Sequence, residues 1–142
     1  MVMVNAVQKL RDERGQMIAE LVIVIPALLL ALVIIVNTGM FFAEAARFDR
    51  VSAELARGLV NSPTDPAIAA PAALQKMLGY SGGKKGPYTA RVHVESTDEI
   101  FLQKRVLNFT LDYELFATNI LPSSVRTISR SKTLVIYWST GL

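Results

Sequence analysis

The 142-residue chain contains no cysteine and only one histidine, His93. Without cysteine it can form no disulfide framework, thiolate metal site or thiol nucleophile. A single histidine excludes the two-histidine metal motifs, and it leaves His93 as the only base for a serine, histidine and aspartate triad. The sequence therefore predicts a protein that is not an enzyme and that uses no cofactor, metal or small-molecule substrate.

Charge of either sign is also scarce. The chain carries 15 basic and 12 acidic residues, which gives a formal net charge of +3. The basic residues are scattered among acidic ones and do not form the one-sided stripe with interleaved aromatics that nucleic-acid binding usually needs. We therefore expect no nucleic-acid partner.

Apolar residues are abundant, at 51% of the chain, and they are concentrated near the N-terminus. The stretch from Leu21 to Ala43 contains no charge across 23 residues. At about 1.5 Å per residue a helix of this length spans roughly 35 Å, which is enough to cross a hydrocarbon core of about 30 Å with some tilt. The sequence from Glu44 onward is ordinary water-soluble sequence.

This pattern divides the chain into segments. We expect a short polar leader at 1–15, a transmembrane helix at 16–43, an amphipathic continuation of that helix at 44–62, and an α+β domain outside the membrane at 63–142. Within the membrane helix, Pro26 removes a backbone hydrogen bond and predicts a kink, and Gly39 is a second soft point. Past the membrane, apolar residues recur at helical spacing to about Val60: Phe48, Val51, Leu55 and Leu59.

A short helix is predicted next. Pro63 and Pro66 interrupt the long helix, and Asp65 is a suitable N-cap with Pro66 at the first helical position. The helix is expected to run from about Pro66 to Leu78, with Pro71 weakening its first part. The glycine-rich stretch 79–87 is predicted to be a flexible turn or loop.

The remainder of the chain alternates with period two, which predicts strands. The predicted strands and the breaks between them are a strand at 88–95, a turn at 96–99, a strand at 106–116, a break at 118–124 and a strand at 127–138. Three such strands favour a small antiparallel sheet, whose apolar face must be covered by the amphipathic part of the long helix or by the short helix. The expected fold class is α+β.

Glu20 stands out because it lies just inside the apolar run. An unpaired carboxylate in a bilayer costs roughly 2.5 to 3.5 kcal/mol, unless it reaches water at the headgroups. If a protease cuts after Gly15, the new α-amino group of Gln16 lies one helical turn from Glu20, or close to the Glu20 of a neighbouring subunit. The two charges could then neutralise each other in a low dielectric.

The sequence around these residues, R-G-Q-M-I-A-E-L-V-I-V-I-P from Arg14 to Pro26, resembles a type IV prepilin cleavage region. Three further features narrow the resemblance to TadE-like pseudopilins of tight-adherence pili. They are the proline six residues after the glutamate, the Asn-Thr-Gly step ending at Gly39, and the segment A-A-R-F-D-R-V-S-A-E-L-A-R. The C-terminal F-T-L-D-Y-E-L-F-A-T-N-I-L-P and S-R-S-K-T-L-V-I-Y are similar to that family's terminal hairpin. The chain departs from the common pattern at Gln16, Met17 and Asn37.

The resemblance implies a minor pilin-like subunit of tight-adherence (Flp) pilus assembly that is not an enzyme. It would be cleaved after Gly15 by an aspartic prepilin peptidase and held in the bacterial cytoplasmic membrane, with a cytoplasmic N-terminus and an extracytoplasmic C-terminal domain. Its partners would be that peptidase, other pseudopilins and pilus assembly proteins.

Two alternatives remain open at this point. The chain could be an uncleaved single-pass envelope protein whose extracytoplasmic domain binds a partner. It could also be a small secreted domain, because Ala43-Glu44-Ala45 offers a signal-peptidase site that would leave Ala46 as the first residue, although the apolar stretch is long for an export signal. Basic residues flank the apolar run on both sides, so the charge distribution alone does not set the orientation.

Overall fold

The computed structural model describes residues 2–98, 102–116 and 126–139, and its fold is α+β, as predicted. The chain forms two compact units, Met1–Thr38 and Gly39–Leu142. Helix α1, Val2–Val60, contributes to both units. The predicted break at 118–124 lies outside the described residues.

The first unit consists of the N-terminal part of α1. Helical residues run through the expected leader and past Pro26 without a break. The described apolar side chains from Leu21 to Val36 are exposed or, at Val33, half-buried. The predicted kinks at Pro26 and Gly39 stay predictions.

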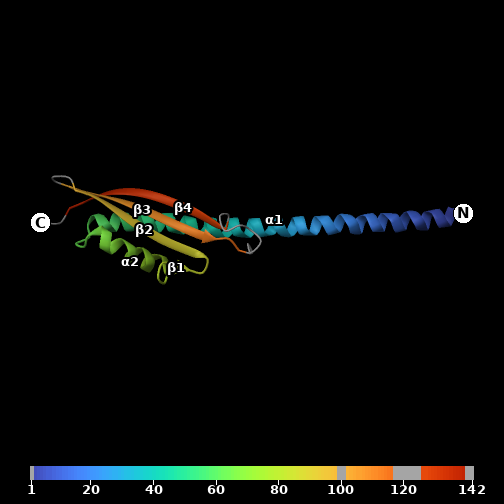
Figure 1. Cartoon of the computed structure of the whole chain (residues 1–142), viewed down its shortest axis with the longest axis horizontal. Helices are drawn as coiled ribbons and strands as arrows, with labels where there is room; N and C mark the ends of the chain where they lie inside the picture. Colours follow the sequence, from blue (N-terminus) through green and yellow to red (C-terminus); the bar gives the residue numbers. More distant parts are fainter. Residues whose placement is uncertain (1, 99–101, 117–125, 140–142) are drawn as a thin grey trace. The chain divides into compact units, whose positions relative to one another are not determined.

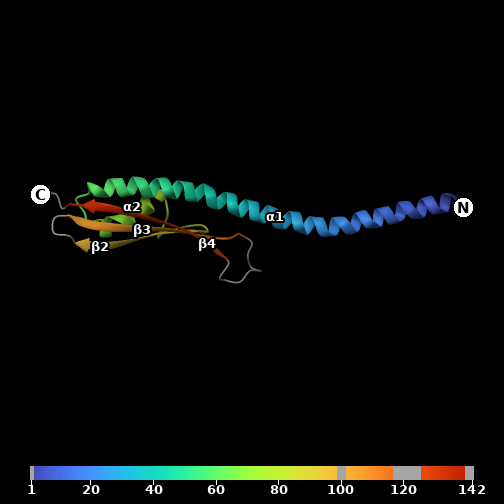
Figure 2. The same ribbon diagram turned by 90° about the horizontal axis from the view of Figure 1, so that it is seen from above.

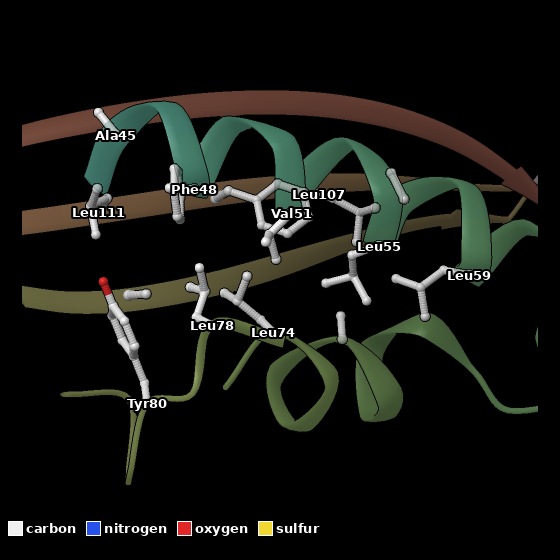
Figure 3. Close-up of a cluster of buried hydrophobic side chains, with 14 of the residues drawn as sticks. Ala45, Phe48, Val51, Leu55, Leu59, Leu74, Leu78, Tyr80, Leu107 and Leu111 are labelled. Atoms are coloured by element: carbon white, nitrogen blue, oxygen red, sulfur yellow. The ribbon is translucent and has the colours of Figure 1, made fainter. Parts of the chain in front are cut away.

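In the second unit α1 is amphipathic, as predicted. Phe48, Val51, Leu55 and Leu59 are all buried, and Figure 3 shows their side chains directed toward α2 and strand β3. Ser52 is also buried on this helix, where its hydroxyl donates a hydrogen bond to the carbonyl oxygen of Phe48 at 2.7 Å. That bond satisfies the hydroxyl without a partner from the sheet.

The short helix α2 spans Pro66–Leu78, which are the predicted bounds. The Asp65 side chain accepts a hydrogen bond from the amide of Ala67 at 2.9 Å, so the predicted N-cap is confirmed. Pro71 lies inside the helix without interrupting it, although as the sixth helical residue it removes one backbone hydrogen bond, the one that an amide at this position would donate to the carbonyl oxygen of Ala67. Gly79, at φ 69°, ends the helix in the left-handed conformation that glycine adopts at low cost.

The strands form one antiparallel sheet in the order β1-β2-β3-β4 (Figure 1). Their bounds are β1 Lys84–Lys85, β2 Tyr88–Asp98, β3 Gln103–Glu114 and β4 Thr127–Trp138. Seen from above in Figure 2, the second-unit part of α1 lies along one side of the sheet. In β2 and β3 alternation sends most apolar side chains to this covered face, where Leu107, Phe109 and Leu111 are fully buried. On β4 it buries Ile136 and Trp138 and leaves Val135 and Tyr137 exposed.

The third predicted strand is confirmed, but the other strand predictions need correction. β2 continues through Ser96 to Asp98, where a turn was predicted, and β3 begins at Gln103 and ends at Glu114 rather than running from Val106 to Phe116. The expected flexible loop contains the two-residue strand β1. The polar strand ends are held by pairing, such as that of Asp98 with Gln103, rather than by burial.

Both helices cover the sheet. The core cluster draws residues from α1, α2, β2, β3 and β4. Among them Phe48 and Phe109 meet edge to face with ring centroids 6.4 Å apart, a favourable aromatic geometry. Arg130 on β4 adds a two-pronged ion pair with Asp49 on α1, at 3.1 and 2.6 Å. The second unit therefore has its own hydrophobic core.

Candidate functional site

Gly15 lies within α1, and no atom lies within 4 Å of the position that a β-carbon would occupy there. The same holds for Gly58 at the far end of the helix. Packing therefore does not require a glycine at position 15. Its role at a cleavage site stays a prediction, and that role can be tested without disturbing a neighbouring side chain.

Gln16 and Glu20 are brought together by the helix. The side-chain amide nitrogen of Gln16 lies 3.3 Å from a carboxylate oxygen of Glu20, and both side chains are exposed. Residues four apart on a helix face the same way, one turn from each other. The carboxylate of Glu20 thus faces the residue whose backbone nitrogen would become the free amine after cleavage at Gly15.

The segment that follows has the length and composition of a single-pass membrane anchor. No residue in its most apolar window is buried. Soluble monomers rarely expose an apolar surface of this extent, because water must order around it. The structure is compatible with an anchor; length and composition do not by themselves exclude an N-terminal export signal, although the apolar stretch is long for one.

Two polar residues at the end of this segment form side-chain hydrogen bonds to backbone carbonyl groups of the same helix. The Thr38 hydroxyl donates a hydrogen bond to the carbonyl oxygen of Ile34 at 2.7 Å. The side-chain amide of Asn37 donates one to the carbonyl oxygen of Val33 at 2.9 Å. Such bonds to the preceding turn lower the cost of placing a polar group in an apolar environment. The division of the chain into two units falls directly after Thr38, at Gly39.

Sequence reasoning missed a group of three tyrosines that holds the start of the second unit. We call Tyr80, Tyr88 and Tyr113 the tyrosine cluster. Tyr80 donates a hydrogen bond to the Glu44 carboxylate at 2.7 Å, and Tyr88 donates to the carbonyl oxygen of Met40 at 3.0 Å. The sequence indicated only part of this cluster. Tyr88 and Tyr113 fall on the apolar faces of adjacent strands, but no pattern in the sequence pointed to Tyr80.

The rings of the cluster also pack together. The Tyr88 and Tyr113 rings stack at 5.1 Å, and Phe41 lies 6.1 Å from Tyr113. Burial, together with the hydrogen bond to Glu44, raises the pKa of Tyr80, so its phenol remains a donor at all physiological pH values. Residues 40–44 are therefore part of the folded second unit.

Arg105 is a second feature that the sequence did not reveal. Its guanidinium is buried and reaches Asp98 at 3.2 Å and Asp65 at 3.4 Å, and it lies 5.6 Å from the Trp138 ring centroid. Burial lowers its pKa, but the hydrogen bonds to the two carboxylates outweigh that effect and leave the pKa raised. The clue was its alternation with Leu107, which places Arg105 on the covered face.

Within residues 2–98, 102–116 and 126–139, no three histidine, cysteine or acidic side chains are grouped as metal ligands would be. His93 lies exposed on the face of β2 opposite the core. Comparison of the chain with family models, curated proteins and solved structures finds no match.

Proposed function

We propose that this chain is a TadE-like pseudopilin, a minor subunit of tight-adherence pilus assembly that is not an enzyme. A prepilin peptidase cleaves it after Gly15, and the mature chain stays in the cytoplasmic membrane through the apolar part of α1. The N-terminus is cytoplasmic and the second unit extracytoplasmic. There the protein joins other pseudopilins and pilus assembly proteins.

The observation that carries the proposal is the geometry of Gln16 and Glu20. Glu20 is the one charged residue in the stretch from Gln16 to Ala43, and its carboxylate lies 3.3 Å from the Gln16 side chain. Cleavage after Gly15 creates a cation on that residue. An uncleaved anchor has no need for a carboxylate at this spacing, whereas a helix that packs sideways in a membrane gains a compensated charge pair.

The exposed apolar surface of the first unit supports an anchor rather than a core helix. The tyrosine cluster argues against release of a secreted domain beginning at Ala46. Such a cut would remove Met40 and Glu44, which accept hydrogen bonds from Tyr88 and Tyr80, and would remove the buried Ala45. The remaining domain would lack part of its own fold.

Coexpression with a prepilin peptidase tests the proposal. The mature chain should begin at Gln16 by N-terminal sequencing, and Gly15→Ala should leave most of the leader attached. Because an added methyl group meets no neighbour at position 15, failure to cleave would report recognition by the peptidase rather than misfolding. Gly58→Ala makes the same open change in the same helix and should be processed normally.

The alternatives predict different termini. An intact leader in the unchanged chain would favour the uncleaved envelope anchor, whose domain binds a partner. A mature chain that begins at Ala46 would indicate a secreted domain. Either result would overturn the proposal, as would normal cleavage of Gly15→Ala.

A further inference from the structure

The outer edge of β2 is open along most of its length. β1 pairs with Tyr88 and Thr89 only, and the amide of Ala90 donates to the carbonyl oxygen of Gly83 at 2.9 Å. In the described part of the chain no strand pairs with this edge from Arg91 to Asp98. An open strand edge presents a row of unpaired backbone groups to any extended chain that fits beside it.

The hydrogen-bond pattern fixes which backbone groups face outward. The Ala90 amide points to the β1 side, whereas the carbonyl oxygen of Pro87 accepts from Glu114, which continues the β3 ladder. Along an antiparallel strand, the backbone N–H and C=O groups of successive residues point alternately to one neighbouring strand and to the other. The N–H and C=O groups of Val92, Val94 and Ser96 therefore face the open edge, where they can form ladder hydrogen bonds with an additional strand.

A groove of about 550 Å³ runs beside this edge. Its inner wall is formed by Pro71, Leu74 and Gln75 of α2, which packs against β2 (Figure 1). Side chains of an added strand that lie opposite Val92 and Val94 would be directed to this wall, because directly opposed residues share a face of the sheet. The groove thus offers both backbone pairing and a strip of apolar contact.

One end of the groove is closed and positively charged. The chain reverses at Gly82 and Gly83, and this turn occupies the position that an added strand would enter after passing Arg91. Lys84, Arg91 and His93 line the groove, and no acidic residue does. Arg91 already pairs with Asp112 at 2.6 Å on the exposed face of the sheet, so Lys84 is the cation available to an added carboxylate. An antiparallel addition runs from Asp98 toward this turn, so the added chain must end there, with its terminal carboxylate near Lys84.

We infer that the open edge of β2 binds the extended C-terminal segment of a partner protein by strand addition, with the partner's terminal carboxylate held near Lys84. This mode of recognition is established chemistry for exposed sheet edges. The inference concerns the second unit alone and goes beyond the membrane function proposed above.

The register sets the preferred sequence of the partner. Its last residue and the second residue before it lie opposite Val92 and Val94 and should be apolar. The residue between them lies opposite His93, on the same face of the sheet as Arg91, and should be acidic. The next outer position lies opposite Glu95 and should be basic, because like charges directly opposite each other destabilise a strand pair.

A labelled peptide, acetyl-Thr-Val-Lys-Val-Glu-Val with a free C-terminus, tests this assignment against the full chain in detergent micelles. Fluorescence anisotropy should show saturable binding, and amide exchange should slow at Val92 and Val94. The C-terminal amide of the same peptide should bind about tenfold more weakly, because a charged partner is lost. Exchanging its Lys and Glu keeps the composition and should weaken binding by about fivefold.

Two variants locate the site. Val94→Pro removes an amide that faces the open edge without removing a β3 ladder bond, and it should abolish binding. Lys84→Glu alters an exposed side chain and should weaken binding by about tenfold, whereas the same change at Lys85, which does not line the groove, should have little effect. Equal binding of the acid and amide peptides, or exchange protection on β4 in place of β2, would overturn the inference; neither result bears on cleavage at Gly15.

Discussion

At the scale of single residues, Asp112 links three strands on the exposed face of the sheet. Its carboxylate accepts hydrogen bonds from Arg91 of β2 and Ser129 of β4, both at 2.6 Å. Partial burial raises its pKa, but these two hydrogen bonds outweigh that effect and leave the pKa below the usual 3.8. Because the folded pKa is the lower one, the stabilisation is present above the unfolded value and is lost as pH falls through the folded value.

We therefore predict that Asp112→Asn lowers the free energy of unfolding by about 1 kcal/mol at neutral pH, a modest effect because Arg91 is largely exposed. The difference from the unchanged chain should shrink as pH falls below 3.8. Thermal unfolding in micelles, followed by the fluorescence of Trp138, the single tryptophan, measures this. Glu114→Gln on the same strand is the control. If Asp112→Asn remained less stable than the unchanged chain at acidic pH, the proposed role of the Asp112 carboxylate would be contradicted.

Glu20 allows a different kind of prediction, because under the proposed function its partner, the α-amino group of Gln16, is created by processing. Glu20→Ala should preserve or improve membrane insertion, since it removes a charge from the apolar segment. It should nevertheless impair assembly with partner pseudopilins, because the new amine of Gln16 is left uncompensated. Membrane fractionation and counts of surface pili measure the two effects, with Glu13→Ala in the leader as the matched control. Normal piliation of Glu20→Ala would contradict charge pairing.

At the scale of elements, α2 is tied to the sheet through its N-cap residue. Asp65 caps the helix through the Ala67 amide and also pairs with Arg105. Asp65→Ala should cost about 1 to 2 kcal/mol of stability, because both contacts are lost. Asp65→Asn keeps a capping oxygen and should cost less. Unfolding followed by Trp138 fluorescence measures both, and equal stability of Asp65→Ala and the unchanged chain would refute the role of the cap.

The sequence predicted elements well where a local rule determines them. The bounds of α2 follow from a capping aspartate, a first-turn proline and a terminal glycine, and those of β4 from turn residues and alternation. The end of β2 and the start of β3 were missed because Ser96, Asp98 and Gln103 carry no hydrophobic signal. They are ordered by strand pairing, which depends on a partner elsewhere in the chain.

The same division holds for the candidate site. Gly15, Gln16 and Glu20 are defined by spacing along one helix, so their juxtaposition could be predicted from the sequence. The tyrosine cluster could not, because Tyr80 and Tyr88 reach residues 40–44 only after α1, α2 and the sheet have packed. Arg105 was missed for a related reason, since the predicted strand began one residue after it.

At the scale of the whole molecule, the division at Gly39 predicts where the chain can be shortened. A chain that begins at Gly39 keeps the residues held by the tyrosine cluster and should fold as a soluble domain. A chain that begins at Ala46 loses the hydrogen bonds of Tyr80 and Tyr88 and the Phe41 contact. We expect it to be less stable by about 2 to 4 kcal/mol.

Urea unfolding of the two shortened chains, again followed by Trp138 fluorescence, measures this difference. The double change Tyr80→Phe and Tyr88→Phe in the longer chain should reproduce part of the loss, because it removes the same hydrogen bonds and keeps the rings. Equal stability of the two shortened chains would show that residues 39–45 belong to the first unit instead.

The helical state of the leader has a consequence for the electrostatics of the mature protein. In the unprocessed chain α1 has no acidic residue in its first turn, and Glu20 lies far from that end. Under the proposed function, cleavage after Gly15 would move the start of the helix to Gln16, where the aligned peptide dipoles present a partial positive charge and disfavour an added cation. Glu20, now near that end, offsets the charges of both the dipole and the amine. The proposed processing would thus change the role of a carboxylate without moving it.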